Sequence, residues 1–173
     1  FYIVYHNLPG GVAEKEYDAD PYALLSRMYL SPDSPREAPL ISDPKMSAGG
    51  LIGRSGAPKG LPDWLSQEEL DFYVEQFKAC GFRGGVNYYR NFQRNWETTE
   101  HLSDAKIEMP TLFIAGEKDN VILGADAEKL RKLMTPYITD LRDVVVVPKM
   151  GHWIQQEDVE TTNRVMLDFL QSL

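Results

Sequence analysis

Apolar positions follow two different patterns along the chain, with a change near residue 104. Before it, apolar residues recur at helical spacing, as at Leu70, Val74 and Phe77. After it, short continuous apolar runs alternate with helical stretches, and residues 144–147 are four consecutive valines, which is typical of a buried parallel strand. The pattern predicts an α/β fold with a helical part at residues 1–103 and a β/α part at residues 104–173.

The helical part carries clear signals for the ends of its helices. Asp20 followed by Pro21 is typical of a helix start. Ser66 and Glu69 have the spacing of a capping box, and Gly81 fits the end of the same helix. A further helix is expected to begin near residue 85, with one side formed by Val86, Tyr89, Gln93 and Trp96.

Residues 31–63 show no apolar period and contain six prolines and five glycines. A connection of this length without secondary structure is uncommon and is usually functional or mobile. We interpret the segment as a flexible loop on the surface of a helical lid formed by residues 1–103.

The β/α part predicts strands over residues 109–116 and 144–147, and parallel pairing between them through a right-handed crossover. A helix is expected over residues 124–137, facing inward through Leu130, Leu133, Met134 and Tyr137. The final helix carries Val159, Val165, Met166, Phe169, Leu170 and Leu173. Because two strands are too few for a covered sheet, we expect the partner strands to lie upstream of residue 1.

Composition and charge limit the kinds of molecule that the chain is expected to bind. The chain has 18 Lys and Arg against 26 Asp and Glu, a net charge of −8, which argues against nucleic acid or an anionic membrane as a partner. It has one cysteine, Cys80, and no apolar stretch of the ~20 residues that span a bilayer. We expect a cytoplasmic protein. Since no metal-binding cluster or phosphate-binding loop is apparent, we expect no metal and no cofactor.

Asp119 and His152 are the candidates for chemistry, because each follows a predicted strand at the edge where open α/β sheets place functional groups. The imidazole would act as general base, and the carboxylate would fix its tautomer and stabilise the imidazolium. His152 alone would serve equally well as a structural histidine, but Asp119 after the preceding strand favours catalysis. Glu117 and Asp126 are rival acids that we interpret as solvated charges, and His6 and His101 as surface or lid histidines.

Five motifs resemble those of soluble epoxide hydrolases of the α/β-hydrolase superfamily. NYYRN at 87–91, between GFRGG at 81–85 and QRNW at 93–96, is similar to their cap tyrosine motif. Tyr2-x-x-Tyr5 before Pro9 resembles the segment of their other cap tyrosine, and LPDWL at 61–65 resembles a further cap segment. GEKD at 116–119 and GHW at 151–153 are similar to the acid and base segments.

The resemblance implies an α/β-hydrolase fold, here the helical cap and the last β/α units of the parallel core sheet. It implies that a nucleophilic aspartate opens a small apolar epoxide and that water then hydrolyses the resulting ester to a vicinal diol. By position, Tyr2 and Tyr89 would donate hydrogen bonds to the epoxide oxygen, His152 would be the base and Asp119 its orienting acid. Tyr5 and Tyr88 are expected to be packing residues.

The chain departs from the family because no nucleophile motif and no oxyanion-hole loop occur in it. We expect both in a missing N-terminal half of the core, which would be a partner of this chain; a homodimer is a further assembly to consider. Two alternatives remain open. One is a haloalkane or haloacid dehalogenase of the same fold, which would hold a halide with Trp, Asn or His donors. The other is a non-catalytic α/β-hydrolase-like binding protein.

Overall fold

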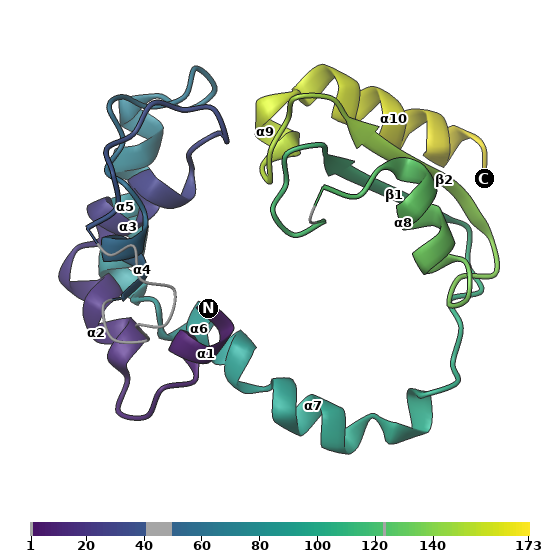
Figure 1. Cartoon of the computed structure of the whole chain (residues 1–173), viewed down its shortest axis with the longest axis horizontal. Coiled ribbons are helices and arrows are strands. Elements are labelled where there is room, and N and C mark those ends of the chain that lie inside the picture. Colours follow the sequence, from purple (N-terminus) through teal and green to yellow (C-terminus); the bar gives the residue numbers. More distant parts are fainter. Residues whose placement is uncertain (1, 41–49, 123) are drawn as a thin grey trace. The chain divides into compact units, whose positions relative to one another are not determined.

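The computed structural model describes residues 2–40, 50–122 and 124–173 of the chain (Figure 1). It divides into two compact units, Phe1–Glu100 and His101–Leu173, which we call the N-terminal and C-terminal units. Within the described ranges, no helix combines the length and the apolar character that crossing a bilayer requires.

The N-terminal unit is helical, and its helices begin where the sequence provides caps. The Asp20 carboxylate accepts a hydrogen bond from the Ala23 amide, and the Ser66–Glu69 capping box is formed, as predicted. Gly81 ends the longest of these helices with a φ of 70°. The helices are α1 (Tyr2–His6), α2 (Val12–Ala19), α3 (Pro21–Met28), α4 (Gly50–Arg54), α5 (Gln67–Cys80), α6 (Arg83–Arg90) and α7 (Phe92–Thr98), with the 3-10 helix η1 (Glu100–Leu102) at its end.

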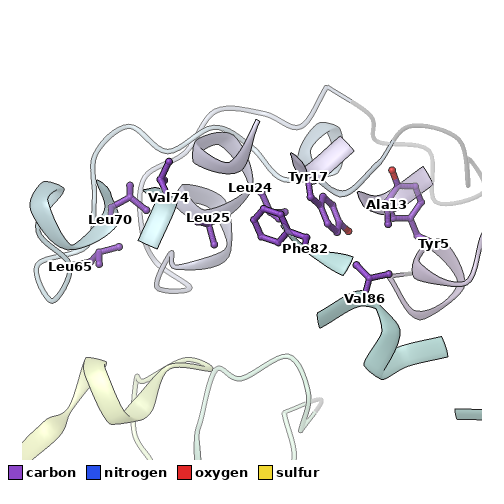
Figure 2. Close-up of a cluster of buried hydrophobic side chains, with 10 residues drawn as sticks. All are labelled: Tyr5, Ala13, Tyr17, Leu24, Leu25, Leu65, Leu70, Val74, Phe82 and Val86. Atoms are coloured by element: carbon purple, nitrogen blue, oxygen red, sulfur yellow. The ribbon is translucent and has the colours of Figure 1, made fainter. Parts of the chain in front are cut away.

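An apolar cluster holds α1 to α6 together (Figure 2). α3 packs against α5, and the rings of Phe77 and Phe82 stack with their centroids 4.4 Å apart. The cluster includes Tyr5 of α1 and Val86 of α6. Both helices that carry the candidate tyrosines are therefore packed into this core. Its buried members are Tyr5, Ala13, Tyr17, Leu24, Leu25, Leu65, Leu70, Val74, Phe82 and Val86.

The predicted loop at 31–63 is more ordered than expected, because its described parts contain α4 and a local backbone pairing. The Glu37 amide donates to the Ala57 carbonyl at 2.8 Å. The Glu16 carboxylate accepts from the amides of Leu51 and Ile52 at 3.0 and 3.2 Å, which fixes the start of α4. The prediction of one structureless connection was therefore wrong for these parts, while residues 41–49 lie outside the described residues.

The helix predicted from residue 85 was also wrong in its extent. α6 begins at Arg83, and a break at Asn91 separates it from α7. The Asn91 side-chain amide donates to the Asn87 carbonyl at 2.9 Å, in place of the backbone amide that would continue the helix. Val86 is buried whereas Trp96 is 80% exposed, so the two do not share one buried side.

The C-terminal unit contains a parallel two-stranded sheet, as predicted, in which Phe113 pairs with Val144 and Gly116 with Val147. α8 packs against β2, and α10 contacts β1 (Figure 1). The short helix α9 was not predicted. The elements are β1 (Thr111–Gly116), α8 (Ala127–Met134), β2 (Leu141–Val147), α9 (Ile154–Glu157) and α10 (Val159–Gln171).

Burial in the C-terminal unit is less extensive than the apolar pattern suggested. Leu130 is buried, but Leu133 and Tyr137 are exposed, and α8 is shorter than the predicted helix. Of the four valines, only Val144 and Val147 are buried. Two strands present too little surface to cover every apolar side chain of the helices beside them. The same holds for α10, whose exposed apolar residues include Val159, Met166, Leu167 and Leu170.

Candidate functional site

Asp119 and His152 form a hydrogen-bonded pair in the C-terminal unit. His152 Nδ1 lies 2.9 Å from Asp119 Oδ2, and Asp119 Oδ1 accepts from the Val121 amide at 2.8 Å. The carboxylate is nearly buried, whereas the imidazole is 56% exposed. Because the carboxylate accepts a hydrogen bond from Nδ1–H, the neutral imidazole carries its lone pair on Nε2. This geometry suits a general base.

The two turns that carry this pair are bonded to each other through their backbones. The Glu117 amide donates to the Val147 carbonyl at 2.9 Å, and the Lys118 amide donates to the Met150 carbonyl at 2.8 Å. The parallel register thus continues beyond the ends of β1 and β2. This continuation brings together two side chains that are 33 positions apart in the sequence.

The two rival acids are both exposed, as expected of solvated charges, but each also has a structural partner. Glu117 Oε2 accepts from the Lys149 amide at 2.8 Å, across the same two turns. Asp126 is the N-cap of α8 and accepts from the Lys129 amide at 2.8 Å. Neither contact involves His152.

Gly116 allows the two turns to approach closely, which the sequence did not reveal. A Cβ atom at this position would lie 2.1 Å from the Gly151 carbonyl oxygen and 2.4 Å from that of Met150. Both are backbone atoms, so neither can move away by a change of rotamer. A side chain at Gly116 would therefore displace the turn that carries His152.

We expect Gly116→Ala to destabilise the protein by about 1–3 kcal/mol, the usual cost of overpacking, and to lower its activity. Urea denaturation followed by circular dichroism would measure the free energy of unfolding. Gly84→Ala is a matched control, because nothing lies within 4 Å of a Cβ atom built there. That variant should be neutral or stabilising, since alanine is favoured over glycine in a helix. Equal stabilities for the two variants would contradict the close approach.

Glu157, at the end of α9, contacts the His152 segment and was missed by the sequence analysis. Its carboxylate accepts from the amides of Gly151 at 2.9 Å and Trp153 at 3.0 Å, the residues on either side of His152. The Trp153 ring packs edge-on against the imidazole, with centroids 5.0 Å apart.

Tyr2 and Tyr89 are neighbours in the N-terminal unit. Their ring centroids are 5.6 Å apart and their planes meet at 81°. In the part of the chain that the structure describes, neither hydroxyl has a hydrogen-bond partner. Burial, with smaller contributions from the hydroxyls of Tyr2 and Tyr88, raises the pKa of Tyr89. The Tyr89 phenol therefore stays protonated at neutral pH and can donate a hydrogen bond.

The other tyrosines of this region are engaged or exposed. The Tyr5 hydroxyl donates to Glu16 at 2.9 Å, and the Tyr17 hydroxyl is hydrogen-bonded to His6 Nε2 at 2.8 Å. Tyr5 is buried, as a packing residue should be, but Tyr88 is 74% exposed, so a packing role for Tyr88 was wrong. Tyr88 also contacts Tyr89, with ring centroids 6.1 Å apart, but it is largely exposed, whereas Tyr2 and Tyr89 both contact the buried His6 ring.

His6, which was expected to be a surface or lid histidine, is buried in the N-terminal unit and packs against the two candidate tyrosines, so the surface alternative is excluded. Its ring lies 4.5 Å from that of Tyr89 and 5.9 Å from that of Tyr2, between centroids. Burial and the charge of Arg90 lower the pKa of His6, against the opposing effect of Glu14. The imidazole is therefore neutral at pH 7. The side chain packed against both tyrosine rings thus carries no charge.

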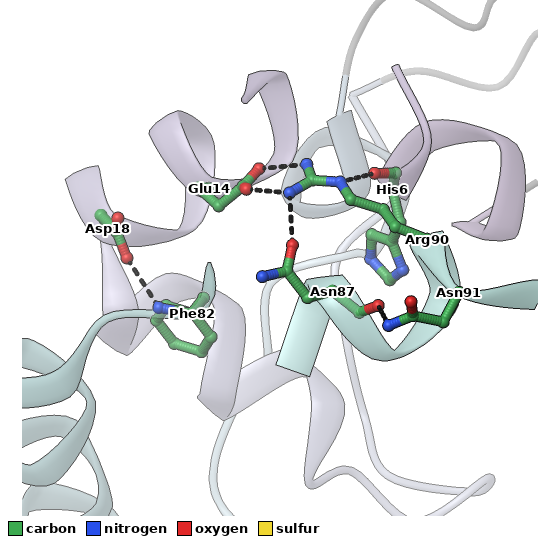
Figure 3. A network of polar contacts seen from close by, with 7 residues as sticks. All are labelled: His6, Glu14, Asp18, Phe82, Asn87, Arg90 and Asn91. Carbon is green, nitrogen blue, oxygen red and sulfur yellow. Dashed lines mark hydrogen bonds and ion pairs between the residues drawn. The ribbon is translucent and has the colours of Figure 1, made fainter. Parts of the chain in front are cut away.

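Arg90 connects the helices that carry these tyrosines (Figure 3). Its Nε donates to the His6 carbonyl at 3.0 Å, and its Nη1 donates to Asn87 Oδ1 at 3.0 Å. Both terminal nitrogens donate to the Glu14 carboxylate, one of them at 2.7 Å. These bonds lower the pKa of Glu14 and raise that of Arg90. The ion pair thus links α1, α2 and α6.

A polar hollow of about 600 Å³ borders the same network, but no predicted site residue lines it. In the ranges that the structure covers, no three His, Cys, Asp or Glu side chains are grouped as metal ligands would be. The predicted residues accordingly form two pairs, Tyr2 with Tyr89 and Asp119 with His152, one in each unit.

Comparison with known proteins gives one consistent group of relatives. No protein family model matches the chain. Epoxide hydrolase A of Mycobacterium tuberculosis is 40% identical over all of this chain and 52% of its own length. The crystal structure of epoxide hydrolase A from Mycobacterium thermoresistibile superposes with a TM-score of 0.82 at 39% identity, over 99% of this chain and 52% of that one. Potato epoxide hydrolase I gives a TM-score of 0.78 at 30% identity, over 99% and 53% of the two chains.

This chain spans about half the length of these relatives, and the match includes both of its units. The parallel pairing of β1 and β2 and the helices beside them agree with the predicted fold class. The chain therefore belongs to the α/β-hydrolase family, and the members that it resembles over its whole length are epoxide hydrolases.

Proposed function

We propose that this chain supplies the oxygen-binding tyrosines and the hydrolytic base of an epoxide hydrolase whose nucleophilic aspartate lies outside it. The observation that carries the proposal is the pair of neighbouring tyrosines, Tyr2 and Tyr89, with hydroxyls that bond nothing else among the described residues. Asp–His pairs occur in hydrolases of many kinds, whereas two available phenols suit a reaction in which negative charge develops on an oxygen atom. The relatives named above support the same assignment.

In the first step, the carboxylate nucleophile attacks an epoxide carbon, and the carbon–oxygen bond of the ring breaks. The bonding electrons pass to the oxygen, which Tyr2 and Tyr89 stabilise by hydrogen bonding and protonation. A phenol with a pKa near ~10 remains a donor at pH 7. One donor aimed at developing charge typically contributes on the order of 3 kcal/mol to the transition state.

In the second step, His152 Nε2 takes a proton from water, and the resulting hydroxide attacks the carbonyl carbon of the ester. The bond to the alkyl oxygen breaks, and this oxygen takes the proton of the carboxyl group, so the diol leaves and the nucleophilic carboxylate is restored. The proton on His152 then returns, through solvent, to the tyrosine that protonated the oxygen in the first step. Asp119, 2.9 Å from Nδ1, stabilises the imidazolium that forms. The carboxylate is nearly buried, so water reaches this pair mainly from the side of the exposed imidazole.

The domain assignment follows the same proposal: residues 1–103 form the cap, and residues 104–173 form the last part of the core. The rest of the core would come from sequence outside this chain. The substrate would be a small, largely apolar epoxide, with water as the second reactant. The single cysteine, Cys80, which allows no disulfide within these 173 residues, supports a cytoplasmic location.

A single-turnover reaction in ¹⁸O-labelled water tests the proposal, with the full-length protein in excess over styrene oxide. The first diol should carry no label, because its new oxygen comes from the enzyme carboxylate while the label enters that carboxylate. Mass spectrometry of the diol and of the nucleophile peptide measures both. Labelled diol in the first turnover would contradict the covalent route. Release of chloride from 1-chlorobutane without any diol from styrene oxide would indicate a dehalogenase instead.

A further inference from the structure

We propose that Glu157 is a positioning residue for His152, holding the base segment from both sides. Glu157 Oε2 accepts from the Gly151 amide at 2.9 Å, and Oε1 accepts from the Trp153 amide at 3.0 Å. One carboxylate thus bridges the backbone amides of the two residues that flank His152. The effect on the reaction rate rests on the proposed function, but the effect on the imidazole does not.

Glu157 is itself held by the helices on either side of it. It is the last residue of α9, and the next residue, Asp158, caps α10 by accepting from the Thr161 amide at 3.0 Å. The buried Thr162 hydroxyl donates to the Ile154 carbonyl at 3.0 Å, which fixes α9 on α10. The bridge therefore joins the His152 segment to a thirteen-residue helix.

A carboxylate suits this position better than its neutral analogue. Two amide donors converge on the side chain, and an ionised carboxylate accepts from both through charge-assisted bonds. Glutamine offers one carbonyl oxygen, and its NH2 group would face the second amide, leaving that donor unpaired. Glu157→Gln therefore changes the bridge while keeping the size of the side chain.

His152 needs this support because its own side chain is weakly held. The imidazole is 56% exposed, and its one hydrogen bond within the described residues is to Asp119. A displacement of about 1 Å in a catalytic group can cost on the order of 10²-fold in rate. Fixing the amides of the residues on both sides of His152 limits the directions in which Nε2 can point. The negative charge of Glu157 also favours the imidazolium that forms during ester hydrolysis.

The test compares Glu157→Gln with Glu160→Gln in the full-length protein. Glu160 is an exposed residue in the first turn of α10, so its variant controls for the loss of one nearby charge. In Glu157→Gln, hydrolysis of the covalent ester should slow by about 10- to 100-fold. Ester formation and kcat/KM for styrene oxide should change by less than about twofold, because the bridge acts only on the base that hydrolyses the ester.

The second readout is the ¹⁵N NMR spectrum of histidine-labelled protein without substrate, with the His152 signals assigned by their loss in His152→Gln. In Glu157→Gln, the linewidth or the position of the Nδ1–H signal should change. In Glu160→Gln, both should stay as in the parent protein. This readout separates the two proposals: a changed signal in a protein that makes no diol would support positioning by Glu157 and contradict the proposed function.

An unchanged His152 signal in Glu157→Gln would overturn the inference, whatever happens to the rate. Unchanged ester hydrolysis in an active enzyme would do the same. If Glu157→Gln does not fold, Glu157→Asp provides the measurement, because it keeps the charge and both acceptor oxygens on a shorter side chain. Its His152 signal should shift in the same direction by a smaller amount, and a signal identical to that of the parent protein would count against the bridge.

Discussion

Replacing His152 with glutamine in the full-length protein is expected to stop the reaction after the ester has formed. Glutamine is similar in size to the imidazole but cannot take a proton from water at neutral pH. General base catalysis contributes about 10²–10⁴-fold, so diol formation should fall by at least the lower of these factors. Ring opening needs no base, and the nucleophile should therefore still be alkylated.

Mass spectrometry of the intact protein after mixing with excess styrene oxide measures this directly. The expected spectrum shows one added substrate mass that persists for many times the parent turnover time. His101→Gln is the matched control, since His101 is an exposed residue of η1 and its variant should turn over normally. Absence of an adduct on the His152→Gln protein, or turnover close to that of the parent, would rule out the role given to this imidazole.

The Asp119–His152 pair was predictable because its position depends on local rules. Each residue follows an apolar run, and parallel strands in register bring such positions to one edge of a sheet. The caps at Asp20 and Ser66 were predictable for a similar reason, since the side chain and the amide that it accepts from lie within three residues.

Contacts between distant backbones could not be predicted in this way. Gly116 looks like any glycine after a strand, and only the structure shows the Gly151 carbonyl where its side chain would be. Glu157 looks like a solvated charge near the start of a helix, because nothing in the sequence shows that its carboxylate turns back to the Gly151 and Trp153 amides. Both residues contact backbone atoms. Because every residue has the same backbone groups, the sequence gives no sign of which of them lie close to Gly116 or Glu157.

Burial was the property that the sequence predicted least well. His6 was expected to be a surface or lid histidine, and nothing in the sequence showed that its ring would be buried, close to Tyr89 and hydrogen-bonded to Tyr17. Leu133 was expected inside because leucine is apolar, and it is 59% exposed. Residue type gives a tendency to be buried, whereas actual burial depends on which neighbours are close enough to cover the side chain.

Changing both Tyr2 and Tyr89 to phenylalanine is expected to abolish ring opening. Each donor of this kind contributes about 10²–10³-fold, so the double variant should form ester at well below a tenth of the parent rate. Stability should change little, within about 0.5 kcal/mol, because the two hydroxyls bond nothing among the described residues and the rings remain. A large loss of activity without a loss of stability would distinguish a role in the reaction from a role in packing.

The measurement is the rate of adduct formation after rapid mixing of protein with styrene oxide, made in the double variant and in both single variants. Tyr88→Phe is the matched control, because Tyr88 is the exposed neighbour of Tyr89 and should leave the rate unchanged. If the two phenols act on the same oxygen, the effects of the single changes should not simply add. Diol production above about a tenth of normal in the double variant would mean that other groups stabilise the alkoxide. A similar loss in Tyr88→Phe would show that the cap responds to any change in this helix.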